Sequence, residues 1–196
     1  MTDQTRRNPN LHSNDDSQRL QEHLRQMSEE QFQRQMRQAA QMLSFGKGKA
    51  AIPLLERCYN LHPDNVDVLT NLGGAYILAG HHRYAVPVLE KASELAPDNP
   101  AVWSNLAAAH LGKLVTATSV RQEKALAAYQ RVLEIDAAYP NIHYNMGLIY
   151  IDQRDWDAAY DAFSSALAVN PYDEDAQNMR ARVDEIRNRP PDPSNN

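Results

Sequence analysis

The architecture of the chain follows from residues 69–99, which read LTNLGGAYILAGHHRYAVPVLEKASELAPDN. Apolar and small side chains recur in this stretch at the three- and four-residue spacing of a helix, in two groups. The groups are Leu69, Leu72, Gly73 and Tyr76, followed by Ala85, Leu89 and Ala92. Gly80 lies between the groups and Pro97 follows the second, and both residue types end helices. The stretch therefore predicts a pair of helices.

The same pattern recurs along the chain at a fixed distance. Pro63 precedes Pro97 by 34 residues, whereas Trp103 precedes its equivalent His143 by 40. Six extra residues therefore lie inside the third copy, between positions 111 and 125. A repeat of this length predicts stacked helix pairs, each of which buries its apolar face against its neighbours.

The repeated pattern resembles the tetratricopeptide repeat, in which an aromatic residue or Leu is followed by Leu-Gly and Tyr, then Ala, a large apolar residue, Ala and Pro. The second copy reads Leu69, Leu72, Gly73, Tyr76, Ala85, Leu89, Ala92 and Pro97 at these positions. The resemblance covers about residues 32–187 and implies an all-α, right-handed solenoid of about four helix pairs. The first copy has Gln35 and Gln38 where the pattern wants large apolar residues, so we expect it to be a degenerate terminal repeat.

We expect a repeat domain at 29–187, with four repeats at about 29–65, 66–99, 100–139 and 140–172. A helix at 173–187 should cap the solenoid, because it carries an apolar stripe of Ala176, Met179, Val183 and Ile186. Pro53 and Pro87 occupy equivalent positions early in second helices. Both should lie in or next to the first turn, where a missing N–H costs little.

The two ends of the chain are polar. Ser28 and Gln31 form a capping-box pattern, which predicts that the first repeat helix starts at Glu29. Residues 1–28 are then an N-terminal arm, in which Leu20, Leu24 and Met27 would allow a short helix at 17–27. That stretch would either be a frayed arm or an extra cap on the first repeat, or form a helix that occupies a groove of this chain or of a neighbour. Residues 188–196 are expected to be a disordered tail.

Composition excludes several classes of partner. The chain has 20 Lys and Arg against 25 Asp and Glu, a net charge of -5, so it lacks the positive field that sequence-independent nucleic-acid binding requires. Its single Cys cannot form an internal disulfide and suits a reducing compartment. No apolar run approaches the roughly 20 residues that a membrane helix needs. We expect a cytoplasmic protein with neither nucleic-acid nor membrane partners.

No residue pattern predicts catalysis, a cofactor or a metal site. Residues 46–49 read GKGK, but Ala50 stands where a phosphate loop requires Ser or Thr. Cys58 occupies a position that alanine fills in other copies, so it should be a buried packing residue. Four histidines within the repeats are expected in a turn, in the core or at an interface: His81, His82, His110 and His143.

Stacked helix pairs form a curved wall lined by the first helix of each pair. In the family that the pattern resembles, this concave wall binds peptide segments of partner proteins. An Asn amide could hold a peptide backbone, since it both donates and accepts hydrogen bonds, although Asn is also simply frequent at this position. The expected groove residues are three equivalent asparagines and the mainly apolar residues around them: Asn71, Asn105, Asn145, Thr70, Ile77, Leu78, Leu111, Tyr144, Leu148 and Ile151.

Two further features bear on the groove. Family members that capture chaperone C-termini clamp a carboxylate with Lys and Arg, and no cation stands at the corresponding sites, which are Met36, Ala40, Asn71, Ala101 and Asn105. A chaperone-tail adaptor is therefore not expected. Ser119 and Gln122 form a second capping-box pattern, which predicts a helix from about Val120 and an enlarged loop at 112–118. That loop either carries function or is a neutral insertion.

The sequence favours a non-catalytic adaptor that binds a peptide or helix of a partner protein in the concave groove. The alternative is a self-associating structural scaffold whose groove or open end is buried in a homo-oligomer. The mass in solution separates the two, because a monomer at micromolar concentration supports the adaptor and a stable dimer supports the scaffold.

Overall fold

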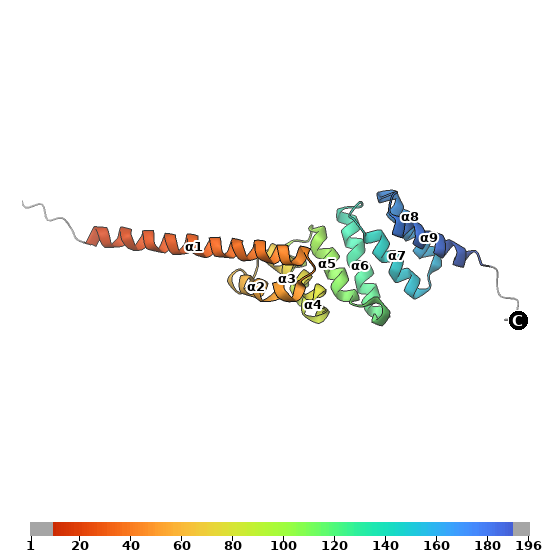
Figure 1. Cartoon of the computed structure of the whole chain (residues 1–196), viewed down its shortest axis with the longest axis horizontal. Coiled ribbons are helices and arrows are strands. Elements are labelled where there is room, and N and C mark those ends of the chain that lie inside the picture. Colours follow the sequence, from red (N-terminus) through yellow and green to blue (C-terminus); the bar gives the residue numbers. More distant parts are fainter. Residues whose placement is uncertain (1–9, 190–196) are drawn as a thin grey trace, which may run out of the picture.

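The computed structural model describes residues 10–189, and within that range every regular element is a helix. The helices form four consecutive pairs and a closing helix, arranged in a row (Figure 1). The pairs are α1 (Asn10–Ser44) with α2 (Gly48–Leu61), α3 (Val66–Leu78) with α4 (His82–Leu95), α5 (Pro100–Leu111) with α6 (Ser119–Ile135), and α7 (Ile142–Gln153) with α8 (Trp156–Val169); α9 (Glu174–Arg187) closes the row. This arrangement confirms the all-α solenoid of helix pairs.

Small residues lie where the two helices of a pair approach each other most closely. A Cβ atom on Gly147 would lie 2.7 Å from the ring of Phe163, and one on Gly73 would collide with Leu89. Alanines at one equivalent position of each second helix are fully buried: Ala51, Ala85, Ala125 and Ala159. The two helices of a pair are therefore so close that an added methyl group would force one of them to move.

Three of the four first helices end in the same kind of turn. Gly46, Gly80 and Arg154 take the left-handed conformation there, with φ of 68°, 76° and 60°. In each turn the next amide donates to a carbonyl five residues back, which satisfies the end of the helix. The third copy departs from this pattern, because Gly112 is followed by the short 3₁₀ helix η1 (Leu114–Thr116). The extra residues thus lengthen both the turn between α5 and α6 and the start of α6, in which Ala125 is the seventh residue whereas its equivalent Ala85 is the fourth residue of α4.

Pro53 and Pro87 are each the sixth residue of a second helix, directly after its first turn. Each removes one intrahelical hydrogen bond and leaves the rest of the helix intact. These positions agree with the expectation from the sequence.

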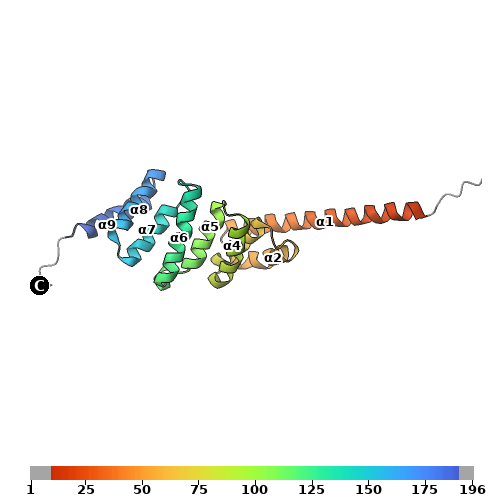
Figure 2. The same cartoon turned by 180° about the vertical axis from the view of Figure 1, so that it is seen from behind.

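The N-terminal helix differs from the prediction. α1 runs without a break from Asn10 to Ser44, so Ser28 lies inside a helix and does not cap one. The start predicted at Glu29 is therefore wrong, and 17–27 belongs to the same helix as the first repeat. The N-terminal part of α1 extends beyond the rest of the molecule (Figure 2). The expectations for residues 1–9 and 190–196 lie outside the described residues.

The start of α6 also differs, by one residue. Its N-cap is Thr118, whose hydroxyl accepts from the amide of Arg121, and the helix begins at Ser119. Gln122 does not complete a capping box, because its side chain is buried and donates to Asp152 Oδ2 at 2.6 Å. Gln153 donates in turn to Gln122 Oε1 at 3.1 Å. Gln122 therefore joins the third helix pair to the fourth.

The pairs do not all stack alike. α1 packs against α3, and α3 packs against α5, so these first helices form a continuous wall. α7 contacts α6, as α3 contacts α2 and α5 contacts α4, but its other main contact with the third pair is with η1 and not with α5. α9 packs against α8 and buries Ala176 and Val183, as expected of a closing helix. The insertion in the third copy thus coincides with a change in how the fourth pair is attached.

Candidate functional site: a groove across three first helices

The wall formed by α1, α3 and α5 contains two adjoining pockets. One has a volume of about 280 Å³ and is lined by Leu43, Thr70, Asn71, Gly74, Ile77, Leu78 and Asn105. The other has a volume of about 390 Å³ and is lined by Phe32, Gln33, Met36, Arg37, Ala40, Asn65, Asp67, Thr70, Asn71, Asn99 and Ala101. Thr70 and Asn71 belong to both pockets, so together they make one hollow, which we call the α1–α3–α5 groove.

The sequence of α3 explains how its side chains reach this groove. Asn65 caps the helix by accepting from the amide of Val68 at 3.0 Å, which fixes where the helix starts. Val68, Leu69, Leu72 and Ala75 then face the core and are buried. The groove residues lie on the opposite side at helical spacing: Asp67, Thr70, Asn71, Gly74, Ile77 and Leu78.

The middle of the groove is open because Gly74 has no side chain. The nearest atom to a Cβ placed there is the Asn105 amide nitrogen, at 4.0 Å. Asn71 and Asn105 are half-buried beside this opening, and Leu78 at its end is 52% exposed. Thr70 is partly engaged already, since its hydroxyl donates to the Val66 carbonyl at 2.7 Å. The groove thus offers two amides next to apolar surface.

The remaining predicted residues lie elsewhere. Asn145 hydrogen-bonds the Tyr129 hydroxyl, whose pKa burial raises to about 12 while the bond to Asn145 lowers it. Tyr144 packs edge-on against Phe163, with ring centres 5.5 Å apart. Leu148 and Ile151 pack in the same apolar cluster as Phe163. Leu111 packs against the apolar core formed by α5, α6 and α7. The structure therefore brings Asn71, Asn105, Thr70, Ile77 and Leu78 together and leaves Asn145, Tyr144, Leu148, Ile151 and Leu111 outside that pocket.

Sequence reasoning missed most of the side of the groove that α1 contributes. Phe32, Gln33, Arg37 and Leu43 line it, and Arg37 places a cation in the same pocket as Asp67. A signal was available, because Phe32, Met36 and Leu43 recur at helical spacing. That spacing indicates an apolar stripe on the first helix, but it does not show which of these residues face the groove.

A separate pocket of about 200 Å³ lies between the start of α7 and the end of α8. His143 lines it at the position that the larger Trp103 fills in the preceding copy. Burial lowers the pKa of His143, and a hydrogen bond to the Ala137 backbone acts in the opposite direction. Asn141, at the pocket rim, takes a left-handed conformation with φ of 65°.

Cys58, His81 and His82, which could carry chemistry, lie in the packed core or at the start of a helix. Cys58 is fully buried, its thiol lies 3.6 Å from Gln35 Oε1, and burial raises the pKa of the thiol. His81 is the N-cap of α4 and His82 is its first residue. Within residues 10–189, no three His, Cys, Asp or Glu side chains gather as a metal site would need. None of the helices in the described part of the chain is long and apolar enough to cross a membrane.

Family models of the tetratricopeptide repeat match residues 42–109, 121–153 and 140–173. No curated protein matches the chain significantly. Among solved structures, MamA is similar over 76% of this chain and 84% of its own, with 21% identity and a TM-score of 0.66. A thermophilic repeat protein of Thermus thermophilus is similar over 81% of this chain and 84% of its own, with 20% identity and a TM-score of 0.68. A tetratricopeptide repeat protein from Parabacteroides merdae is similar over 81% of this chain and 60% of its own, with 22% identity and a TM-score of 0.64.

Proposed function

The chain belongs to the tetratricopeptide repeat family, and from this premise we propose that it binds an extended peptide or a helix of a partner protein in the α1–α3–α5 groove. The family supports a protein–protein interaction module in general, and its members are generally not enzymes. The observation that carries the finer proposal is the pair of pockets that share Thr70 and Asn71. Because they adjoin, one ligand could fill both.

The groove suits a ligand of limited length. Packed helices lie about 10 Å apart, so three neighbouring first helices span about 20 Å, the length of about six extended residues. Leu43, Ile77 and Leu78 would take apolar side chains of the ligand, while Asn71 and Asn105 would hold its main chain. Affinity would then come mostly from burial and register from the hydrogen bonds.

The test starts from a partner captured by affinity pull-down and identified by mass spectrometry, whose binding segment is then titrated by calorimetry. Leu78→Asp should weaken binding at least tenfold, because it replaces an apolar side chain at the end of the groove with an unpaired charge that a bound ligand would cover. Asn105→Ala should weaken it by about 0.5–1.5 kcal/mol, through the loss of one hydrogen bond. Both variants should keep the melting temperature of the native chain, since neither side chain is fully buried.

Leu61→Asp is the matched control. Leu61 is 58% exposed, close to the 52% of Leu78, but it lies at the end of α2 and lines neither pocket of the groove. Its substitution should leave the affinity unchanged. If both groove variants fold and bind as tightly as the native chain, the partner binds elsewhere.

The alternative function, a scaffold whose groove is buried in a homo-oligomer, makes a different prediction. Leu78→Asp would then lower the mass of the purified protein measured by light scattering. An unchanged mass, together with lost partner binding, supports the adaptor.

A further inference from the structure

The turns that join the first and second helix of each pair lie next to one another along one edge of the molecule. Gly48 lies against Leu78 and Ala79, and Gly112 lies against His82. The third turn meets the fourth through the hydrogen bond from Gln122 to Asp152. The helices of the later pairs run across the long axis, so their ends form two opposite edges (Figure 1). We call the edge with these turns the first edge, and the edge with the turns between successive pairs the second edge.

The first edge is basic over the first three helix pairs. Residues 45–49, 79–84 and 112–124 hold six Lys and Arg against a single acid, Glu123. The six are Lys47, Lys49, Arg83, Lys113, Arg121 and Lys124, and all but the half-buried Arg121 are exposed. The positive charge of this edge acts on His82, whose pKa is lowered first by burial and then by Arg121 and Lys113. The excess of positive charge ends at the fourth pair, where residues 152–157 carry three Asp and one Arg.

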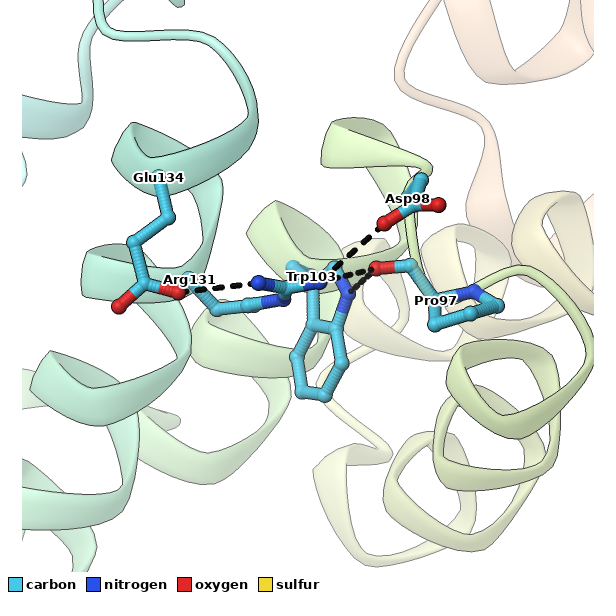
Figure 3. A network of polar contacts seen from close by, with 5 residues as sticks. All are labelled: Pro97, Asp98, Trp103, Arg131 and Glu134. Carbon is cyan, nitrogen blue, oxygen red and sulfur yellow. Dashed lines mark hydrogen bonds and ion pairs between the residues drawn. The ribbon is translucent and has the colours of Figure 1, made fainter.

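The second edge is acidic along its whole length. Residues 61–67, 91–99, 131–137 and 170–175 hold nine acids against two cations. Lys91 pairs with Asp64 at 2.8 Å, and Arg131 lies between Asp98 at 3.2 Å and Glu134 at 3.0 Å (Figure 3). Asp98 nevertheless stays 87% exposed. The two cations therefore leave most of the negative charge of this edge uncompensated.

Both edges also expose apolar side chains beside their charges. The first edge exposes Phe45, Tyr84, Val115 and Val120. The second edge exposes Leu61, Leu95, Val169 and Tyr172. Burial of such residues would supply affinity that exposed ion pairs alone do not, since each exposed pair contributes only about 0.2–1 kcal/mol.

We propose that the basic first edge of one molecule binds the acidic second edge of a second copy of this chain. The two edges are opposite ends of the same helices, so their charges and apolar residues repeat at the same spacing of about 10 Å. The net charge of -5 favours this partner over a large polyanion, which the rest of the surface would repel. Because the two surfaces differ, one contact leaves a free edge on each molecule, and the assembly should grow as further copies bind there.

The charges of the fourth pair determine how the first edge of one molecule aligns with the second edge of its neighbour. Asp152, Asp155 and Asp157 would face like charges if they met the second edge of the neighbour. The neighbour should therefore align its acidic turns with the first three pairs. The first edge shares no residue with the α1–α3–α5 groove, whereas Asn65, Asp67 and Asn99 belong to both the groove and the second edge, so substitutions on the first edge test self-association without changing the groove.

The experiment measures weight-average mass by sedimentation equilibrium at about 100 μM protein, in about 20 mM and about 500 mM NaCl. At low salt the native chain should exceed twice its monomer mass and continue to grow with concentration. At high salt it should approach the monomer, because salt screens exposed charges. A native chain that stays monomeric at low salt would overturn the proposal.

Charge reversal then tests which surfaces meet. Lys47→Glu with Lys113→Glu leaves the first edge with four cations against three acids, and Glu94→Lys with Glu174→Lys leaves the second edge with seven acids against four cations, so each double variant weakens the charge of one edge. Each double variant alone should be monomeric at low salt, and an equimolar mixture should associate again. A mixture that stays monomeric, or a variant that associates like the native chain, would contradict edge-to-edge pairing.

Arg182→Glu with Arg189→Glu is the matched control, because it changes the net charge as Lys47→Glu with Lys113→Glu does but lies on α9 and just beyond it. This control should associate like the native chain. Cosedimentation of a monomeric native chain with vesicles of anionic lipid would instead make the first edge a membrane-binding surface. Circular dichroism of every variant checks that the fold is kept.

Discussion

At the scale of single residues, the closeness of the two helices in a pair rests on positions without a side chain. Gly73 and Gly74 are neighbours in α3 but have opposite surroundings. Gly73 faces Leu89, which is fully buried, whereas Gly74 faces the open groove. Sequence alone identifies Gly73 as a position of the repeat that requires a small residue, because Ala107 and Gly147 occupy the equivalent positions in the next two copies. It does not show that Gly74 opens a pocket, since that depends on the neighbouring helices α1 and α5.

This contrast gives a prediction with its own control. Gly73→Ala should lower the free energy of unfolding by about 1–3 kcal/mol, because the added methyl group collides with Leu89 in a filled core. Gly74→Ala should leave it unchanged or raise it by up to about 1 kcal/mol, since alanine favours the helix and meets no close atom. Urea unfolding followed by circular dichroism measures both. Equal effects of the two substitutions would mean that the α3–α4 contact is looser than described.

At the scale of elements, the sequence predicts the helix pairs well because each pair repeats a period of apolar and small residues. Helix ends are predicted less well. Ser28 has the pattern of a cap, yet residues 10–44 contain no Pro or Gly that would stop a helix from continuing through it. Gln122 likewise has the spacing of a capping residue but bonds Asp152, 30 residues away. A local pattern cannot distinguish a cap from a side chain engaged by a distant element.

The long helix α1 gives the prediction at this scale. Phe32 is 5% exposed and packs with Cys58 and Val68, whereas Met27, little more than one turn earlier, is 54% exposed. Phe32→Ala should therefore destabilise the chain by about 3–5 kcal/mol, through lost burial and the cavity left behind. Met27→Ala should change stability by less than about 0.5 kcal/mol. Thermal unfolding of both variants locates where α1 joins the solenoid, and a large loss from Met27→Ala would place that point further toward the N-terminus.

At the scale of the whole molecule, composition and arrangement give different information. The net charge of -5 predicts nothing about where charges lie, and only the stacking of the turns gathers the cations on one edge and the acids on the other. The candidate groove shows the same limit. Periodicity indicates which side of α3 faces outward, but the neighbouring helices determine whether those residues face a pocket. Asn71 and Asn145 are equivalent in the repeat, yet one lines the groove and the other bonds Tyr129.

Three histidines spread over the molecule should make its stability depend on pH. Burial is the largest cause of a lowered pKa at each, aided at His82 by Arg121 and at His110 by Lys124, with Glu90 opposing it at His110 and the Ala137 backbone at His143. The folded state then binds fewer protons than the unfolded state, so stability is complete above the ordinary pKa of about 6.5 and is lost as pH falls below it. The melting temperature should be lower at about pH 5 than at about pH 7.5, and replacing all three with Gln should flatten this difference. Since Gln does not titrate, an equally steep dependence in the triple variant would assign the effect to other groups.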